Sequence, residues 1–297
     1  MQQEKAALPL PGRHDIDRWG TPGAALKMME RCGIEKLIVL NVLPSIEMIE
    51  AGLARLGPGL SPRDYEKARS NLEKEMVERL KRLNTWSCEL GRSTRRFIPF
   101  IAVQKLLGAE GMVAEVVRCH GLGGKGVKLQ PGMNGYFPGD RALWPMYAKC
   151  QEIGFPIASD SGTYGRVSPC GAHYGEPDNF ADVLKSFPNL TFVMCHFPSA
   201  YWDERIYLAR EYPNLYFDIS GGFAAPDLLA RDGPRALHEE DAVRVMRSVG
   251  LDRFMFGTDG PSVMPQPWIE QTLRLSLTSE EKAMLLAENA ARIYRLR

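Results

Sequence analysis

The sequence predicts an α/β protein of the (β/α)8 TIM-like barrel class whose first strand is missing or irregular. Seven short apolar runs have the length and composition of buried strands, a helical pattern separates nearly every pair of runs, and 297 residues suit one barrel. Strands that alternate with helices in this way pair in parallel through right-handed crossovers. The predicted strands begin near Leu37, Phe97, Gly124, Phe155, Thr191, Leu215 and Arg253.

The N-terminal region lacks the strand with which a barrel should begin. Residues 1–23 are rich in proline and glycine and contain no apolar run of strand length. The first clear unit is a helix over Pro22–Arg31, which Gly33 ends and the strand Leu37–Leu43 follows. Further helices are predicted over Ser61–Leu90, Ala109–Arg118, Ala142–Glu152, Asn179–Ser186, Asp203–Glu211, Glu239–Val249 and Ser279–Tyr294.

Composition narrows the class of protein and its partners. Hydrophobic residues make up 44% of the chain and charged residues 25%, without a break in composition, so we expect one domain over residues 1–297. A net charge of +1 argues against nucleic acid or an anionic membrane as the partner. The first residues lack the apolar core of a signal peptide, and six cysteines without a C-x-x-C pair suit a reducing compartment. We therefore expect a cytoplasmic protein.

An open doubly wound sheet is the alternative to the barrel. Its dinucleotide-binding version carries a G-x-G-x-x-G motif after an early strand, and no such motif occurs there. Parallel barrels place their chemistry at the carboxyl ends of the strands, so polar residues at those ends are the site candidates. The set comprises Asn41, Gln104, Lys128, Gln130, Asp160, His196, Asp218, Ser220 and Asp259.

Asp259 is the candidate with the most suggestive surroundings. It lies in Arg253–Pro261, where the apolar run Phe254–Phe256 has strand composition and stops abruptly. Gly257 and Gly260 on either side would let a metal or a substrate approach the carboxylate closely. An Asx-type turn that closes a strand is the structural alternative.

His196 and Lys128 each have a functional and a structural interpretation. His196 follows a core strand and titrates near neutrality, so a proton carrier competes with a hydrogen-bonded core histidine. Lys128 stands inside a strand, where an unpaired ammonium is costly, so it pairs either with an acid such as Asp160 or with a substrate. Together, Asp160, His196 and Asp259 offer acid/base groups or metal ligands in one pocket, which packing alone explains poorly.

Several local patterns occur in the order of one known family. Phe256–Pro261 resembles its Phe-Gly-(Ser/Thr)-Asp-x-Pro motif, and Glu288–Arg292 resembles its Glu-Asn-Ala closing helix. Other segments that resemble the family are Gly33–Leu40, Arg96–Phe100, Gly126–Leu129, Gly154–Gly162, Phe192–His196 and Tyr212–Asp218. Over about residues 22–297 the chain thus resembles the amidohydrolase-related branch of the amidohydrolase superfamily. That branch holds metal-dependent hydrolases and non-oxidative decarboxylases.

The resemblance implies a divalent metal, most simply zinc, and roles for three residues. Asp259 would be a metal-linked aspartate that also takes or gives a proton, and His196 would be a ligand or a general acid/base. Asp160 stands where the family has a histidine ligand, and aspartate can bind zinc or a harder metal. The resemblance therefore implies Asp259 and His196 as catalytic residues, and Asp259, Asp160 and His196 as metal ligands.

The chain departs from the family at its start. The family's first strand ends in His-x-His, which supplies two metal ligands, and this sequence contains no His-x-His. A catalytic zinc usually needs three protein ligands, so the loss is large. Three explanations stay open: the first strand is encoded upstream, the chain is a variant with weak or no metal binding, or residues 1–20 complete the barrel irregularly with His14 or Asp17 as substitutes.

Three functions from different classes follow. The leading hypothesis is a metal-dependent hydrolase that opens a lactone, amide or ester of a small cyclic or aromatic acid with metal-activated water. The first alternative is non-oxidative decarboxylation of a hydroxybenzoate-like or unsaturated acid. The second alternative is a catalytically degenerate, metal-free barrel that binds a ligand without turnover.

Two long loops at the predicted barrel mouth, Pro131–Asp140 and Ser161–Asp178, are expected to select the substrate. They carry aromatic and basic side chains, which suit a flat anionic ligand. We expect a small anionic substrate, no nucleic acid or membrane, and a homodimer as the assembly. The candidate substrate-binding residues are Lys128, Tyr164, Arg166, His173 and Trp202.

Overall fold

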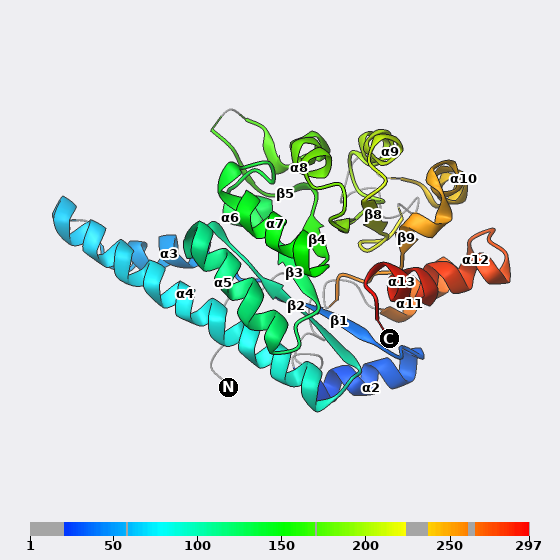
Figure 1. Cartoon of the computed structure of the whole chain (residues 1–297), viewed down its shortest axis with the longest axis horizontal. Helices are drawn as coiled ribbons and strands as arrows, with labels where there is room; N and C mark the ends of the chain where they lie inside the picture. The colour runs from blue at the N-terminus through cyan, green and yellow to red at the C-terminus, as the bar shows by residue number, and fades with distance from the viewer. Residues whose placement is uncertain (1–20, 58, 170, 224–236, 261–264, 297) are drawn as a thin grey trace.

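A curved, seven-stranded parallel sheet forms the centre of the molecule (Figure 1). The structure is a computed structural model that describes residues 21–57, 59–169, 171–223, 237–260 and 265–296. Its strands pair, all in parallel, in the order β1-β2-β3-β4-β7-β8-β9. They are β1 (Leu37–Leu40), β2 (Phe97–Ala102), β3 (Gly126–Leu129), β4 (Ile157–Asp160), β7 (Phe192–Cys195), β8 (Leu215–Asp218) and β9 (Phe254–Met255). All seven predicted strands are confirmed, and so is the α/β barrel class.

The sheet has a single break, between β9 and β1. Neither of these edge strands pairs with a further strand among the described residues. A closed eight-stranded barrel has no free edge, so one more strand would have to pair with both. Because the observed strands follow chain order from β1 onward, that strand would be the first of the barrel. Residues 1–20, with His14 and Asp17, lie outside the described residues.

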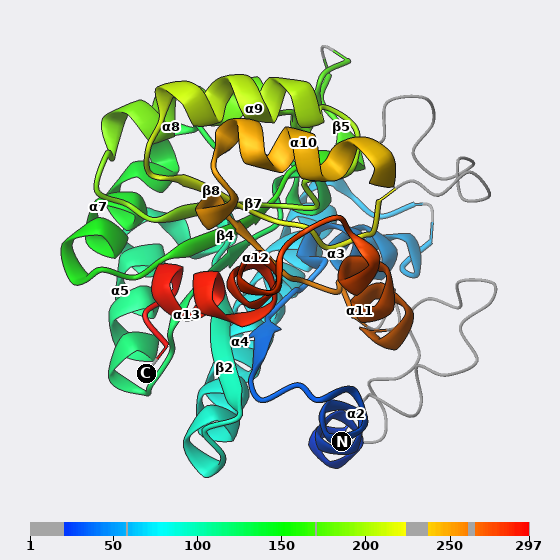
Figure 2. The same cartoon turned by 90° about the vertical axis from the view of Figure 1, so that its right-hand side faces the viewer.

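Helices cover the outer face of the curved sheet (Figure 2). Most of them connect consecutive strands, as the sequence predicts. The predicted final helix is interrupted by a π-helical segment, Met284–Glu288. The helices of eight or more residues are α2 (Pro22–Cys32), α3 (Ser45–Ala54), α4 (Pro62–Ser93), α5 (Gly108–Gly121), α7 (Trp144–Ile153), α9 (Trp202–Glu211), α10 (Glu239–Val249) and α11 (Pro265–Arg274). Shorter ones are α6 (Pro131–Asn134), α8 (Ala181–Ser186), α12 (Ser279–Ala283) and α13 (Asn289–Ile293). Of these described helices, none is both long and apolar enough to cross a bilayer.

The longest helix, α4, joins the sheet to a projecting pair of helices. Ser61 caps it by accepting a hydrogen bond from the backbone N–H of Asp64 at 3.1 Å. One part of α4 packs on β2 and another on α3, and the two helices extend together away from the body of the molecule (Figure 1). At their contact, Gly52 of α3 leaves room for Leu72 of α4. Helix α3 was not predicted.

Two further elements were also missed in the sequence. The loop Ser161–Asp178 contains an antiparallel hairpin of β5 (Gly162–Val167) and β6 (His173–Gly175). Its glycine-rich, polar sequence carries none of the apolar alternation that marks a strand. Helix α11 follows the Asp259 turn. The hairpin begins directly after β4, so it stands over the same end of the sheet as Asp160.

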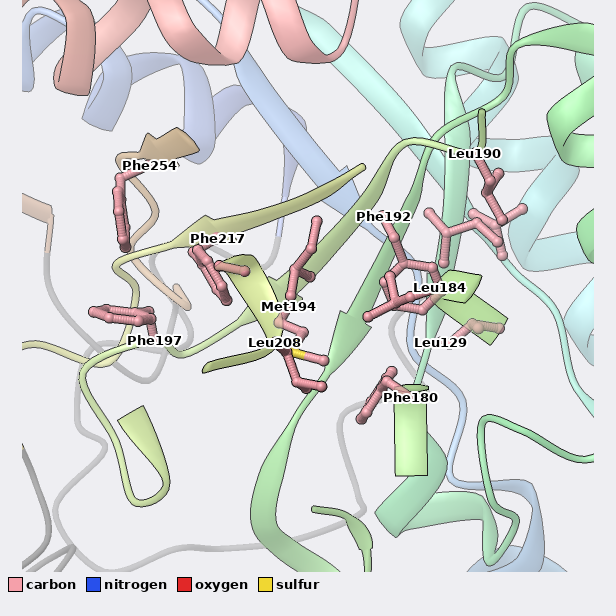
Figure 3. Close-up of a cluster of buried hydrophobic side chains, with 14 of the residues drawn as sticks. Leu129, Phe180, Leu184, Leu190, Phe192, Met194, Phe197, Leu208, Phe217 and Phe254 are labelled. Atoms are coloured by element: carbon pink, nitrogen blue, oxygen red, sulfur yellow. The ribbon is translucent and has the colours of Figure 1, made fainter. Parts of the chain in front are cut away.

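The main core fills the space between the sheet and the surrounding helices. Rings from three strands or strand ends meet there, and the ring centroids of Phe197, Phe217 and Phe254 lie 4.8–5.2 Å apart. Figure 3 shows these rings beside the aliphatic side chains of neighbouring elements. A second cluster lies on the opposite, inner side of the sheet. It contains Ile98, Phe100, Ala158, Val193, Cys195 and Met255.

We predict that Asn289 ties the last helix to the sheet. Its buried side-chain amide donates to the carbonyls of Leu251 and Phe254 at 2.9 Å and 2.8 Å. Asn289→Leu leaves both carbonyls without this partner, so chemical denaturation should show a loss of about 1–3 kcal/mol in the free energy of unfolding. Asn71→Leu, at an exposed position of α4, should change it by less than about 0.5 kcal/mol. Equal values for the two variants would contradict this role.

Candidate active site

Strand alternation carries three charged side chains to the inner side of the barrel mouth. Val127 and Leu129 belong to the main outer core, so Lys128 between them faces inward. Asp160 ends β4, two residues after the inward-facing Ala158, and therefore points the same way. Asp218 ends β8 and alternates with core residues in the same manner. All three side chains are buried.

The Asp218 carboxylate fixes His196 just beyond β7. Its Oδ1 accepts hydrogen bonds from the backbone N–H of His196 at 2.9 Å and of Ser220 at 3.1 Å. The Ser220 hydroxyl also donates to this oxygen at 2.5 Å, and its Oγ lies 2.8 Å from His196 Nδ1. His196 has a φ of 66°, a left-handed conformation that is uncommon for residues other than glycine. Asp218 thus holds both the backbone and the ring of His196.

The hydrogen bonds around the imidazole of His196 require it to be a proton donor on both sides. Because the Ser220 hydroxyl gives its hydrogen to Asp218, its Oγ can only accept from Nδ1. On the other side, Nε2 lies 3.3 Å from Asp160 Oδ2, and a carboxylate also only accepts. Only the imidazolium form carries a proton on both nitrogens. The geometry therefore selects charged His196.

The charges around His196 also favour its protonated form. Burial alone would raise the pKa of Asp160, but the hydrogen bond and charge of His196, with the charge of Lys128, hold it below its ordinary value. Burial alone would lower the pKa of His196, but Asp160 outweighs it, helped by Asp218 and Asp259, and the pKa rises. His196 and Asp160 therefore form an ion pair at the barrel mouth.

Asp259 lies at the rim of the same site. It is exposed, and its φ of 54° makes it another of the few described non-glycine residues in the left-handed region. Its pKa is raised by partial desolvation and by the charge of Asp218, against the lowering effect of His196. Gly257 brings this turn close to β8, because a Cβ there would lie 3.1 Å from the Cβ of Ser220. Gly257 therefore makes room for the side chains of Ser220 and Asp218, whereas the close approach of a metal or a substrate to Asp259 stays a prediction.

Lys128 lies deep in the mouth with few partners of its own. Its Nζ is 3.3 Å from the sulfur of Cys195, a thiol whose pKa burial raises well above its ordinary value. Burial alone would lower the pKa of Lys128, but neighbouring groups, including Asp160 and Asp218, raise it, so Lys128 is charged. A thiol is a weak acceptor, so a three-donor ammonium here can bind a further anion. A narrow crevice beside it is lined by Gln104, Gln130 and other residues and is too tight for a water molecule.

A fully buried arginine from α9, Arg205, fastens the two loops that carry Asp160 and His196. It donates to the Ser161 carbonyl at 2.6 Å, directly after β4, and to the carbonyls of Phe197 and Ala200 at 3.2 Å and 2.8 Å, after β7. Burial lowers its pKa to about 10, so it stays charged at neutral pH. No sequence pattern singled out Arg205, because an arginine that follows two acids in the first turn of a helix ordinarily faces solvent.

The described residues do not fit a divalent metal on their own. Across the described ranges, no three histidine, cysteine, aspartate or glutamate side chains come together in a way that could hold an ion. The Nε2 of His196 and the carboxylate of Asp160 face each other instead. Three protein ligands are the usual minimum for a catalytic zinc. The ligand set implied for Asp259, Asp160 and His196 is therefore brought into one site, but it is not assembled around a common point.

The other predicted substrate-binding residues occupy varied places. Arg166 on β5 makes a two-pronged ion pair with Glu50 of α3, at 2.7 Å and 2.9 Å. His173 on β6 is half-buried and its Nδ1 has no hydrogen-bond partner. Trp202, at the start of α9, packs against the main core. Tyr164 lies on β5, and its side chain is outside the described part. Their roles toward a substrate stay predictions.

From the sequence, Asp218 and Ser220 were recognisable as strand-end residues, but no role could be assigned to them. Their spacing was a usable signal, because an acid and a hydroxyl two residues apart at a strand end can share one turn. The structure places both of them directly behind His196.

We predict that the pKa of His196, followed by NMR titration, lies above its ordinary value of about 6.5. Asp160→Asn removes the main raising partner and should lower this pKa, whereas Asp178→Asn, an exposed acid before α8, should leave it unchanged. A raised folded-state pKa means that the pair stabilises the fold fully below about 6.5 and loses this contribution as the pH rises through the folded value. A His196 pKa that does not respond to Asp160→Asn would contradict the ion pair.

Arg205→Met should lower the free energy of unfolding by about 3 kcal/mol or more, because several buried carbonyls lose their donor. Arg205→Lys keeps the charge but not the forked set of donors, so its free energy of unfolding should lie between those of Arg205→Met and the native protein. Arg210→Met, at an exposed position of the same helix, should stay within about 0.5 kcal/mol of the native protein. Urea denaturation measures all three. A native-like midpoint for Arg205→Met would rule out the fastening role.

Solved structures with the same fold extend over nearly the whole chain. An uncharacterized TIM-barrel protein from Bordetella bronchiseptica is 21% identical with a TM-score of 0.69, covering 93% of this chain and 83% of that one. The 5-carboxyvanillate decarboxylase of Sphingomonas paucimobilis is 17% identical with a TM-score of 0.67, covering 97% and 88%. A dihydroxybenzoic acid decarboxylase from Polaromonas sp. JS666, with bound manganese, is 16% identical with a TM-score of 0.64, covering 93% and 86%. At these identities the likeness shows the fold.

The family itself is shown by the sequence match. A comparison with curated proteins found no significant match. A family model described as amidohydrolase, in contrast, matches residues 58–296, which is most of the chain. This range includes β2 to β9 and all the site residues described above. The chain belongs to the amidohydrolase family.

Proposed function

We propose that the protein is a lyase that removes the carboxyl group of a small aromatic or unsaturated acid without oxidation. The observation that carries this proposal is the imidazolium of His196, whose two N–H groups both face acceptors at the barrel mouth. Decarboxylation needs an acid that protonates carbon, whereas hydrolysis needs a base that activates water. A histidine held in its protonated form suits the first reaction better.

In the proposed reaction, His196 delivers a proton to the carbon that bears the carboxylate. The carbon–carbon bond then breaks, its electron pair returns to the ring or double bond, and carbon dioxide leaves. His196 regains its proton from solvent. Nε2 is the donor, because Nδ1 is held by Ser220. The neighbouring Asp160 stabilises the charged imidazole before the transfer and accepts no proton itself.

Lys128 is the proposed anchor for the substrate's negative charge. Its buried ammonium has a thiol as its nearest hydrogen-bond partner and lies on the same inner side as Asp160. An anionic substrate would supply the acceptors that this ammonium lacks, which agrees with the small anionic substrate expected from the sequence. The crevice beside Lys128 would have to widen to admit it. Tyr164, Arg166, His173 and Trp202 are more remote candidates, and Arg166 would first have to leave Glu50.

Two of the similar structures support the choice of reaction. They are described as decarboxylases of 5-carboxyvanillate and of dihydroxybenzoic acid, both of which are aromatic acids with ring hydroxyl groups. We therefore propose hydroxybenzoate-like acids as the first substrates to test. A cytoplasmic location and a homodimer also remain proposals.

A divalent metal is part of the proposal only as a cofactor to be tested. One similar structure contains manganese, and a metal would supply a positive centre that orients a carboxylate. The described donors do not form a three-ligand group, so neither the zinc expected from the sequence nor manganese is assigned to them. The same observation favours a second candidate, a barrel that binds an acid without turnover. The hydrolase hypothesis is the third candidate function. An assay for carbon dioxide release and for hydrolysis separates the three candidates.

We predict that the purified protein releases carbon dioxide from one or more hydroxybenzoic acids, assayed with and without added manganese or zinc. His196→Gln should lower kcat by about 100-fold or more, because it removes the proton donor. His120→Gln is the matched control, since His120 lies exposed on α5 and packs against Phe155. Cleavage of lactones, esters or amides without carbon dioxide release would favour the hydrolase. Binding without turnover at every added metal would favour the inactive barrel.

A further inference from the structure

A cavity separate from the His196 site opens at the same end of the sheet. It has a volume of ≈ 200 Å³ and lies among α3, α4, the 3-10 turn Lys105–Leu107 and α6. Helix α3 follows β1, the 3-10 turn follows β2, and α6 follows β3, so the cavity belongs to the loop face of the barrel. His196, Asp160 and Asp259 come from the other strands. We propose that this cavity is a second binding site, for an uncharged organic group about the size of one six-membered ring.

The size and the floor of the cavity fit such a group. Ile49 and Leu53 are buried in its floor, and Ile46 and Leu106 add further apolar surface. An apolar protein cavity of about 150 Å³ is known to hold benzene, so ≈ 200 Å³ leaves room for a ring with a small substituent. It is too small for a drug-sized molecule, for which pockets start at about 300 Å³.

Charge pairing at the rim argues for an uncharged ligand. Glu50 is held by Arg166 at 2.7 Å and 2.9 Å, and Arg69 by Glu73 at 3.1 Å. The remaining charged side chain of the lining, Lys105, pairs with Asp140. Every charged side chain that lines the cavity thus already has a partner of opposite sign. An ionic ligand would have to break one of these pairs, whereas a neutral ring would not.

A polar wall separates the cavity from the crevice beside Lys128. Ser45 donates its single hydroxyl hydrogen toward Gln104 Oε1 at 2.5 Å and Asn134 Oδ1 at 3.1 Å. Gln104 and Asn134 line the cavity on one side and the crevice on the other, and Lys128 lines the crevice. The Ser45 oxygen can still accept a hydrogen bond from a hydroxyl group in the cavity. A ring that carries a hydroxyl therefore suits the site best.

Two sources could supply this ring. It is either a second group of the acid whose carboxylate Lys128 binds or a separate neutral molecule. The first assignment rests on the proposed decarboxylase function, whereas the existence of the site does not. Phenol is the probe, because it is uncharged at neutral pH and combines a ring with one hydroxyl.

The test follows methyl resonances of the isotope-labelled protein by NMR while phenol is added. We expect phenol to shift the methyl signals of Ile49, Leu53 and Leu106, and benzoate, which is charged, to shift them far less. Ile49→Trp, which fills the cavity, should weaken phenol binding at least tenfold. Leu106→Phe fills the cavity from the 3-10 turn and replaces Ile49→Trp as the test if that variant does not fold. Leu273→Trp, at an exposed position of α11, is the matched control and should bind phenol as the native protein does.

The proposal is overturned if phenol leaves these methyl signals in place at saturating concentration, or if both filling variants bind it as the native protein does. Kinetics then separate the two sources. Phenol that raises the KM of a hydroxybenzoic acid without changing kcat identifies a shared substrate site, and phenol that changes kcat identifies a separate ligand. Both outcomes support the site. Because the NMR arm needs no turnover, an inactive protein would contradict the proposed reaction and leave the test of the cavity intact.

Discussion

The Asp218 carboxylate is the point on which the geometry of the site depends. One of its oxygens accepts from two backbone N–H groups and one hydroxyl, and two of these three donors belong to Ser220. Through the backbone it holds His196 in a left-handed conformation, and through Ser220 it provides an acceptor for the Nδ1 proton of the ring. Such strain persists only where the surroundings over-determine it. An aspartate at the end of one strand therefore decides what the histidine after the preceding strand can do.

Around this centre the charges alternate. His196 lies between Asp160 and the Asp218–Ser220 pair, and Lys128 lies deeper on the same side. Arg205 donates hydrogen bonds to the loop that follows Asp160. Such an arrangement of charges keeps the imidazole protonated although its side chain is only 19% exposed to water. The fully buried guanidinium of Arg205 donates its hydrogen bonds to backbone and hydroxyl oxygens. Arg205 thus positions loops, and in the proposed reaction the proton comes from His196.

The sequence was most informative where one local pattern decided the structure. Buried parallel strands appear as short apolar runs, and all seven were found, because neighbours on both faces demand apolar side chains. The hairpin β5–β6 was missed because its sequence is glycine-rich and polar, and helix α3 was missed although it packs on α4 where Gly52 leaves room for Leu72. Contacts between segments distant in sequence, such as this one, are not visible in a local pattern. For the same reason, His196, Asp160 and Asp259 could be named in advance, but not the fastening role of Arg205. The metal ligands inferred from family resemblance were the weakest part, since coordination depends on distances between separate strands.

The central claim is that His196, oriented through Ser220, protonates carbon. It is tested most directly by incubating the protein with hydroxybenzoic acids in deuterium oxide and following the product by NMR. We expect a product with one deuterium at the ring carbon that lost its carboxylate. We also expect that Ser220→Ala, which frees the ring of His196, forms this product with a lower kcat and an unchanged KM. If the native protein yields no labelled product while the same preparation hydrolyses lactones or esters, the claim is wrong.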